Sequence, residues 1–173
     1  FEAGMYQLGG NALFLSSRDL QIGRGEPIKD TARVISRFLQ GIMIRTFSQE
    51  EVETLAKYSS IPIINGLTDS EHPCQVLADL MTIREYKNTL EGLNVAYIGD
   101  GNNMANSLIV GCLKTGMNFS LASPKEYMPD ENYLLRGKEL SKLECTKFTI
   151  THSPSEAIKN ADVVITDVWA SMG

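Results

Sequence analysis

The segment His72-Pro73-Cys74-Gln75 places an imidazole and a carboxamide close together at the predicted start of an amphipathic helix. Proline is favoured at the first helical position because its missing N–H would be unpaired there in any case. With Pro73 in that position, His72 and Gln75 are three residues apart and lie on one face of the opening turn. Since a helix N-terminus favours negative charge, the segment is suited to an oxygen that is, or becomes, anionic.

Other polar residues follow predicted strands, at the end of a parallel sheet where ligands bind. They are Arg45 after residues 42–44, Asn65-Gly66-Leu67 after 61–64, Gly99-Asp100-Gly101-Asn102-Asn103 after 95–98, and Asp167 after 163–166. Taken singly, Arg45 is an ordinary ion-pair partner, His72 a structural histidine and Gln75 a solvated side chain. Together, the three can each donate a hydrogen bond to one developing oxyanion, and we favour that interpretation.

The glycine-containing turn after residue 98 resembles a dinucleotide-binding turn, but the match fails. Met104 stands where a third small residue is needed, and the next strand ends in Ala122-Ser123-Pro124, without an acidic residue for a ribose. Two interpretations stay open. The segment is a tight turn in which an Asn caps the helix, or a helix mouth at which an Asn amide holds a carboxylate.

The segment Asp167-Val168-Trp169-Ala170-Ser171-Met172-Gly173 combines an acid, a hydroxyl and a glycine around a single Trp. In one interpretation it is a strand-to-helix connection, in which Ser171 caps the helix and Trp169 packs. In the other, Asp167 at the end of a strand receives an ammonium group. The residues alone favour neither of these two interpretations.

Strands and helices alternate along the chain, which predicts an α/β protein with parallel sheets. The polar stretch 84–92 follows a long helix and precedes a new strand, so we predict a domain junction there. The expected architecture is two doubly wound α/β/α domains, residues 1–88 and 89–173, joined by that helix and both incomplete in this chain. The predicted strands are 12–15, 41–44, 61–64, 95–98, 119–122, 148–150 and 163–165, and a helix is predicted at 1–8.

The composition narrows the class of ligand. The chain has 173 residues, 43% of them hydrophobic, and a net charge of −5 without long runs of either sign, so nothing favours nucleic acid or anionic lipid. Its three cysteines are too few and scattered for a disulfide framework, and no His or Cys spacing suggests a metal. Apolar runs are too short to cross a bilayer. We expect a cytoplasmic protein that binds a small molecule.

Five motifs, in order, make the chain resemble the ornithine carbamoyltransferases over nearly its whole length. They are Asp30-Thr31-Ala32-Arg33-Val34, Ile63-Ile64-Asn65-Gly66-Leu67, His72-Pro73-Cys74-Gln75, Gly99-Asp100-Gly101-Asn102-Asn103, and Asp167-Val168-Trp169-Ala170-Ser171-Met172-Gly173. The His-Pro-x-Gln element is shared with aspartate carbamoyltransferases, whereas the Asn-Asn turn and the Ser-Met-Gly ending resemble the ornithine branch. The resemblance implies transfer of a carbamoyl group from carbamoyl phosphate to the δ-amine of L-ornithine, without a metal or organic cofactor.

The resemblance also implies a role for each candidate residue. Arg45, His72 and Gln75 would surround the carbamoyl oxygen as part of the carbamoyl-phosphate site. The ornithine-binding residues would be Leu67, Asn103, Asp167, Ser171 and Met172. Gln21 corresponds to a residue that family members extend into a neighbouring subunit's carbamoyl-phosphate site, which implies a homotrimer with shared active sites; otherwise it is a solvated loop residue.

The chain departs from the family pattern at both ends. It opens at Phe1 without the Ser-Thr-Arg-Thr-Arg segment that grips the phosphate in family members, and the later His-Cys-Leu-Pro segment is not in it. We therefore expect a central piece of a longer enzyme that is inactive alone. Alternative readings are a carbamoyltransferase for a related amine, such as putrescine, an acylated ornithine or aspartate, and a non-catalytic nucleotide-binding module.

Overall fold

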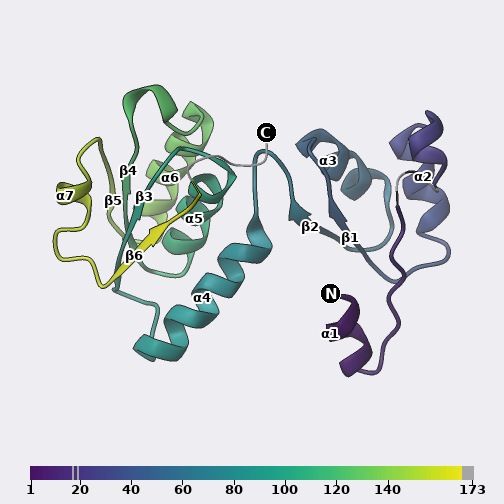
Figure 1. The fold of residues 1–173 in the computed structure, drawn as a ribbon, viewed down its shortest axis with the longest axis horizontal. Helices are drawn as coiled ribbons and strands as arrows, with labels where there is room; N and C mark the ends of the chain where they lie inside the picture. The colour runs from purple at the N-terminus through teal and green to yellow at the C-terminus, as the bar shows by residue number, and fades with distance from the viewer. Residues whose placement is uncertain (17, 19, 169–173) are drawn as a thin grey trace. The chain divides into compact units, whose positions relative to one another are not determined.

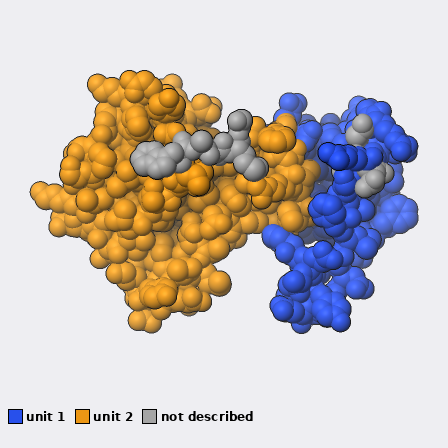
Figure 2. All heavy atoms as spheres, in the orientation of Figure 1, with its two compact units in different colours: residues 1–42, 50–63 blue, residues 43–49, 64–173 orange. Residues whose placement is uncertain are grey.

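The computed structural model describes residues 1–16, 18 and 20–168, which divide into two compact units (Figure 2). The first unit comprises residues 1–42 and 50–63, and the second comprises residues 43–49 and the chain from residue 64 onward. Each unit is described by itself below. None of the described helices is both long and apolar enough to cross a membrane.

The first unit is built mainly from short helices. These are α1 (Glu2–Gln7), the 3-10 helix η1 (Gln21–Arg24), α2 (Ile28–Ile35) and, except for its first residue, α3 (Gln49–Tyr58). The buried apolar side chains of this unit come from α2 and α3 and are Ala32, Val52 and Leu55. Gln21 is exposed in η1.

The predicted strand at residues 12–15 is wrong. Residues 10–16 have no regular secondary structure, and Leu13 and Phe14 expose 76% and 86% of their surface. An apolar run becomes a strand only when another strand satisfies its backbone groups, and the described chain places none beside it. The helix predicted at 1–8 is confirmed as α1.

The strands β1 (Ile42–Arg45) and β2 (Ile63–Leu67) form a two-stranded sheet. The Ile42 N–H donates to the Pro62 carbonyl at 3.0 Å and the Thr46 N–H donates to the Leu67 carbonyl at 3.0 Å. From the first of these hydrogen bonds to the second, the residue numbers rise in both strands, so β1 and β2 are parallel. Arg45 and Leu67 therefore stand at the same, carboxyl end of this sheet.

The second unit contains a four-stranded parallel sheet in the order β5-β4-β3-β6. Its strands are β3 (Asn94–Ile98), β4 (Asn118–Ala122), β5 (Phe148–Thr151) and β6 (Val163–Thr166). Each was predicted from the sequence to within a residue or two at its ends. The α/β class with parallel strands is thus confirmed.

Helices cover both faces of this sheet (Figure 1). The α5 helix (Asn103–Lys114) packs between α4 (Pro73–Lys87) and α6 (Glu131–Leu143), and together they bury the large apolar side chains of β3 and β4. The opposite face is covered by the short α7 (Pro154–Ala157), where Ala96, Ala122 and Ala157 meet. A second 3-10 helix, η2 (Lys125–Tyr127), follows β4.

Candidate active site

The strand order of the second unit creates a switch point between β3 and β6. From β3 the chain runs outward to β4 and β5, and then returns to β6 on the other side of β3. The strand order therefore reverses between β3 and β6, and open α/β sheets bind ligands in the crevice at the carboxyl ends of the strands at such a point. A cavity of about 520 Å³ lies here, within the second unit.

This cavity collects six of the predicted site residues. Its lining includes Arg45, Leu67, His72, Gln75, Asn103 and Asp167. Gln21 lies in the first unit, in η1. Ser171 and Met172, and with them Trp169, lie outside the described residues.

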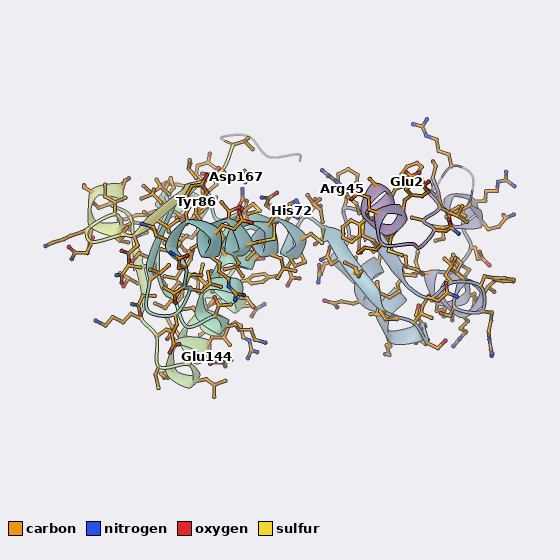
Figure 3. The ribbon with its side chains drawn as sticks, turned by 90° about the horizontal axis from the view of Figure 1, so that it is seen from below. Glu2, Arg45, His72, Tyr86, Glu144 and Asp167 are labelled. Carbon is orange, nitrogen blue, oxygen red and sulfur yellow. The ribbon has the colours of Figure 1, made fainter. Side chains whose placement is uncertain are left out.

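His72 stands immediately before α4, and Pro73 is the first helical residue, as the sequence predicted (Figure 3). The backbone N–H of His72 donates to the Ser107 hydroxyl at 2.8 Å. The Nδ1 atom of the ring is buried and finds no hydrogen-bond partner among the described residues. A buried polar atom without a partner calls for an explanation, and a bound ligand is one.

The pKa of His72 is lowered from its ordinary value. Burial is the main cause, because it disfavours the charged imidazolium, and the positive charge of Arg45 acts in the same direction. The carboxylates of Asp79 and Asp167 oppose both effects. His72 is therefore neutral at pH 7, and its ring offers one N–H donor and one unprotonated nitrogen.

Gln75 lies on the next turn of the same helix face and is held by a residue that the sequence reasoning missed. Its Nε2 donates to the Asp79 carboxylate at 2.9 Å, four residues further along α4. Asp79 also lines the cavity. The i, i+3, i+7 spacing of His72, Gln75 and Asp79 places all three on one helix face, which is the signal that could have revealed Asp79.

The first turn of α5 is closed by its own side chains. The Asn102 carboxamide oxygen accepts hydrogen bonds from the backbone N–H groups of Met104 and Ala105, which is a helix N-cap. The amide nitrogen of Asn102 donates to Asp167 Oδ2 at 2.8 Å. The interpretation of this turn as an Asn-capped helix start is thus confirmed.

Tyr97 was expected only as part of a buried strand, but its hydroxyl reaches the same turn. The hydroxyl donates to the Asp100 carbonyl at 3.0 Å, and the residue lines the cavity while being 0% exposed. Burial, followed by the charge of Asp167, raises the pKa of Tyr97 above its ordinary value. Nothing in the alternation of β3 distinguishes this tyrosine from a core residue.

Buried polar side chains of α5 hold the loop that leads into α4. Asn103 donates from its amide to the Thr68 carbonyl at 2.9 Å, and Asn106 donates to the Ser70 carbonyl at 2.9 Å. Ser107 accepts from the His72 N–H, as described above. These three residues of α5 are at most 8% exposed, so the loop is fixed at both ends and in the middle by buried hydrogen bonds.

The Asn103 amide thus has an internal partner in this structure. One of its two amide hydrogens is engaged by the Thr68 carbonyl. Because a carboxamide nitrogen carries two donors, the second hydrogen and the carboxamide oxygen are not used by that bond. Its predicted contact with an ornithine carboxylate stays a prediction.

The charged residues of the cavity lining are predominantly acidic. Arg45 carries a positive charge, whereas Asp69, Asp79 and Asp167 carry negative charges. Charges of one sign lining a cleft raise the local concentration of ligands of the other sign. The described lining therefore favours a cationic ligand. The Arg45 guanidinium in the same lining can donate hydrogen bonds to a ligand oxygen that bears partial or full negative charge.

Two family models match the chain in succession. Residues 1–85 match the carbamoyl-phosphate binding domain of aspartate/ornithine carbamoyltransferase, and residues 91–173 match its aspartate/ornithine binding domain. The chain belongs to the aspartate/ornithine carbamoyltransferase family. It therefore contains sequence from both domains of a carbamoyltransferase, and the cavity contains residues from both matched ranges.

Individual members of the carbamoyltransferase family give the same picture. The chain is 60% identical over its 173 residues to the ornithine carbamoyltransferase of Anoxybacillus flavithermus, covering 55% of that protein. It is 56% identical to the ornithine carbamoyltransferase of Bacillus subtilis, covering 54% of it. The chain thus spans about half the length of the curated relatives it matches.

Solved structures of family members agree with the fold. The ornithine carbamoyltransferase of Pyrococcus furiosus matches 98% of the chain with a TM-score of 0.93 and 49% identity, and the chain covers 54% of it. An anabolic ornithine carbamoyltransferase from Campylobacter jejuni matches 99% of the chain with a TM-score of 0.92 and 43% identity, and 57% of it is covered. All four of these relatives are named ornithine carbamoyltransferases.

Proposed function

We propose that this chain provides the central part of an ornithine carbamoyltransferase, which transfers the carbamoyl group of carbamoyl phosphate to the δ-amine of L-ornithine and gives L-citrulline and phosphate. The observation that supports this most is one cavity that contains Arg45, His72 and Gln75 together with Asp167. The names of the relatives give the same acceptor.

In the proposed reaction the neutral δ-amine attacks the carbamoyl carbon. A C–N bond forms, negative charge grows on the carbonyl oxygen, and the C–O bond to phosphate breaks. The proton that the amine loses ends on the departing phosphate, which leaves as hydrogen phosphate. Arg45, His72 and Gln75 would donate hydrogen bonds to that oxygen, where charge develops most. A neutral His72 suits this role because its N–H donor adds no positive charge that would repel an ammonium acceptor.

The acceptor would occupy the acidic side of the cavity. In the proposal Asp167 and Ser171 receive the α-ammonium of ornithine, and Asn103 and the Met172 backbone hold its α-carboxylate. The Leu67 backbone adds further contacts. The three carboxylates of the lining support a substrate that carries ammonium groups. Ornithine has two such groups before it loses a proton for attack.

The wider setting belongs to the same proposal. We infer a division into a carbamoyl-phosphate-binding domain at residues 1–88 and an ornithine-binding domain at 89–173. We also infer a homotrimer in which Gln21 reaches a neighbouring subunit's site, a cytoplasmic location, and a place in arginine metabolism. An oligomer would be detected by light scattering, and loss of Gln21 would then raise the KM for carbamoyl phosphate.

The test requires a full-length enzyme, because the chain spans about half of its relatives. We define the chimera as the Anoxybacillus flavithermus ornithine carbamoyltransferase in which these 173 residues replace the matched segment, which is 60% identical. Citrulline formation is measured with ornithine, putrescine, an acylated ornithine and aspartate. We expect ornithine to react fastest, and equal rates with putrescine would contradict the proposed acceptor.

The proposed role of His72 as a hydrogen-bond donor to the carbamoyl oxygen is tested in the chimera by the substitution His72→Ala. Removing one donor to a developing oxyanion lowers turnover by roughly 100- to 1000-fold. His152→Ala is the matched control, because His152 is exposed and outside the cavity lining. Unchanged turnover in His72→Ala would remove His72 from the mechanism.

A further inference from the structure

We propose that Asp79 is a positioning residue, which holds the Gln75 carboxamide by its nitrogen and so fixes the orientation in which Gln75 meets the carbamoyl oxygen. This inference rests on the proposed function. Its geometric basis is the 2.9 Å hydrogen bond from Gln75 Nε2 to Asp79 Oδ1, with both residues lining the cavity. The two residues are one helical turn apart on α4, where i, i+4 side chains meet.

A carboxamide needs such a constraint because its two ends have opposite hydrogen-bonding character. A half-turn about the last side-chain bond exchanges the NH₂ donor for the carbonyl acceptor. An oxygen turned toward a developing oxyanion would repel it, whereas an N–H stabilises it. An ionised carboxylate only accepts hydrogen bonds, so Asp79 selects the orientation with nitrogen toward itself.

The constraint leaves Gln75 able to act. The amide nitrogen has two hydrogens, and the bond to Asp79 uses one of them. The second stays on the same nitrogen, within the cavity lining. Because the acceptor is a carboxylate, the bond is charge-assisted and stronger than a bond between neutral groups, which suits a side chain that is otherwise exposed.

Asp79 also has an electrostatic route to the reaction, and the test must separate the two. The charged groups that act on His72 are Arg45 at the end of β1, Asp79 on α4 and Asp167 after β6. Removing the charge of Asp79 would therefore lower the pKa of His72 further, even if Gln75 had no part in the reaction. A double-mutant cycle distinguishes an effect that passes through Gln75 from one that does not.

The experiment compares Asp79→Asn, Gln75→Ala and the double variant in the chimera. We expect Asp79→Asn to lower kcat roughly tenfold, with a smaller change in the KM for carbamoyl phosphate, because the constrained N–H is needed most in the transition state. In the Gln75→Ala background the same change should alter kcat less than twofold. Equal factors in both backgrounds, or no loss in Asp79→Asn alone, would overturn the proposal.

Two further measurements keep the outcome interpretable. Glu85→Gln removes an exposed carboxylate from the same helix and should leave kcat unchanged. The pH dependence of kcat is recorded for each variant, because an effect through His72 shifts the acidic limb whether or not Gln75 is present. The kcat values are therefore compared on the pH-independent plateau, and a plateau loss in Asp79→Asn that persists when Gln75 is absent contradicts the proposal. If Asp79→Asn does not fold, Asp79→Glu, which moves the carboxylate by one methylene, replaces it in the same cycle.

The test also separates this inference from the function on which it rests. If the unsubstituted chimera folds but forms no citrulline, the proposed function fails. If it forms citrulline and the effects of Asp79→Asn and Gln75→Ala multiply independently, only the role of Asp79 fails.

Discussion

The helices α4 and α5 begin at the same cavity, and their first turns are built in opposite ways. The α5 turn is closed by Asn102, which caps two backbone N–H groups and also bonds to Asp167. The residue before α4, His72, makes no side-chain cap bond within the described chain, and its ring nitrogen Nδ1 is left without a partner there. A satisfied helix start stabilises the fold, whereas an unsatisfied one is available to a ligand.

The two starts are also unequal partners. The loop before α4 is held by hydrogen bonds to three residues of α5, which are Asn103, Asn106 and Ser107. The capped start of α5 therefore positions the uncapped start of α4. These hydrogen bonds explain how the partly buried His72 and the exposed Gln75 keep fixed positions although the start of α4 has no side-chain cap. Changes at α5 should therefore cost stability first, and changes at the start of α4 should cost activity first.

The largest effect on stability is expected from Gly101→Ala, in the turn before α5. A Cβ at this position would lie 2.0 Å from the Pro129 nitrogen and 2.4 Å from the Met128 carbonyl carbon, which are backbone atoms that cannot move aside cheaply. We expect a loss of about 3 kcal/mol in the free energy of unfolding, measured by urea denaturation. Gly4→Ala, where nothing lies within 4 Å, is the control and should cost nothing.

Asn102→Ala tests the closed start directly. Loss of an N-cap costs about 1–2 kcal/mol of stability, and here the bond to Asp167 is lost as well. His72→Ala removes no cap bond and should change the free energy of unfolding by less than about 0.5 kcal/mol. Equal losses in the two variants, measured by chemical denaturation, would end the contrast between the two helix starts.

Ser107→Ala tests whether α5 positions the start of α4 through the hydrogen bond from the His72 N–H to the Ser107 hydroxyl. The variant leaves the His72 N–H without its acceptor, which costs about 1 kcal/mol of stability. In the chimera it should also lower kcat severalfold, because His72 would lose its fixed position. A stability loss with unchanged kcat would show that the bond serves the fold alone.

The smallest effect is expected in the pH dependence of stability. The pKa of His72 is lowered in the folded chain, so below its ordinary value of 6.5 the unfolded chain binds more protons than the folded one. The contribution of this group is complete above pH 6.5 and is lost as the pH falls through the lowered folded pKa. The melting temperature of His72→Asn should therefore fall less between pH 7 and pH 5 than that of the unsubstituted chain, and His152→Asn is the matched control.

The sequence predicted the regular elements well where periodicity and end signals agreed. The four strands of the second unit and the start of α4 at Pro73 follow from apolar runs, turns and a proline at the first helical position. The predicted strand at residues 12–15 is wrong because apolar content does not supply a pairing partner. The division at residue 88 stays a prediction.

The cavity was predictable in outline and not in detail. Six of the predicted residues follow strand ends or a helix start, and a parallel sheet brings such positions together. Tyr97 could not be found, because its position in β3 reads as core and only the structure shows where its hydroxyl points. The role of Asn103 in holding Thr68 was equally hidden, since a side chain that bonds a loop 35 residues away leaves no local pattern.

The return of β6 to the far side of β3 has a consequence for the order of folding. Val95 pairs with Val163, so the strands that flank the cavity are 68 residues apart in the chain, whereas β3 and β4 pair across 24. Loop-closure entropy rises with that separation, and contacts between distant segments form slowly. We expect the β6 amides to gain protection from hydrogen exchange after those of β3 and β4, so that the cavity is completed only once the framework around it is in place.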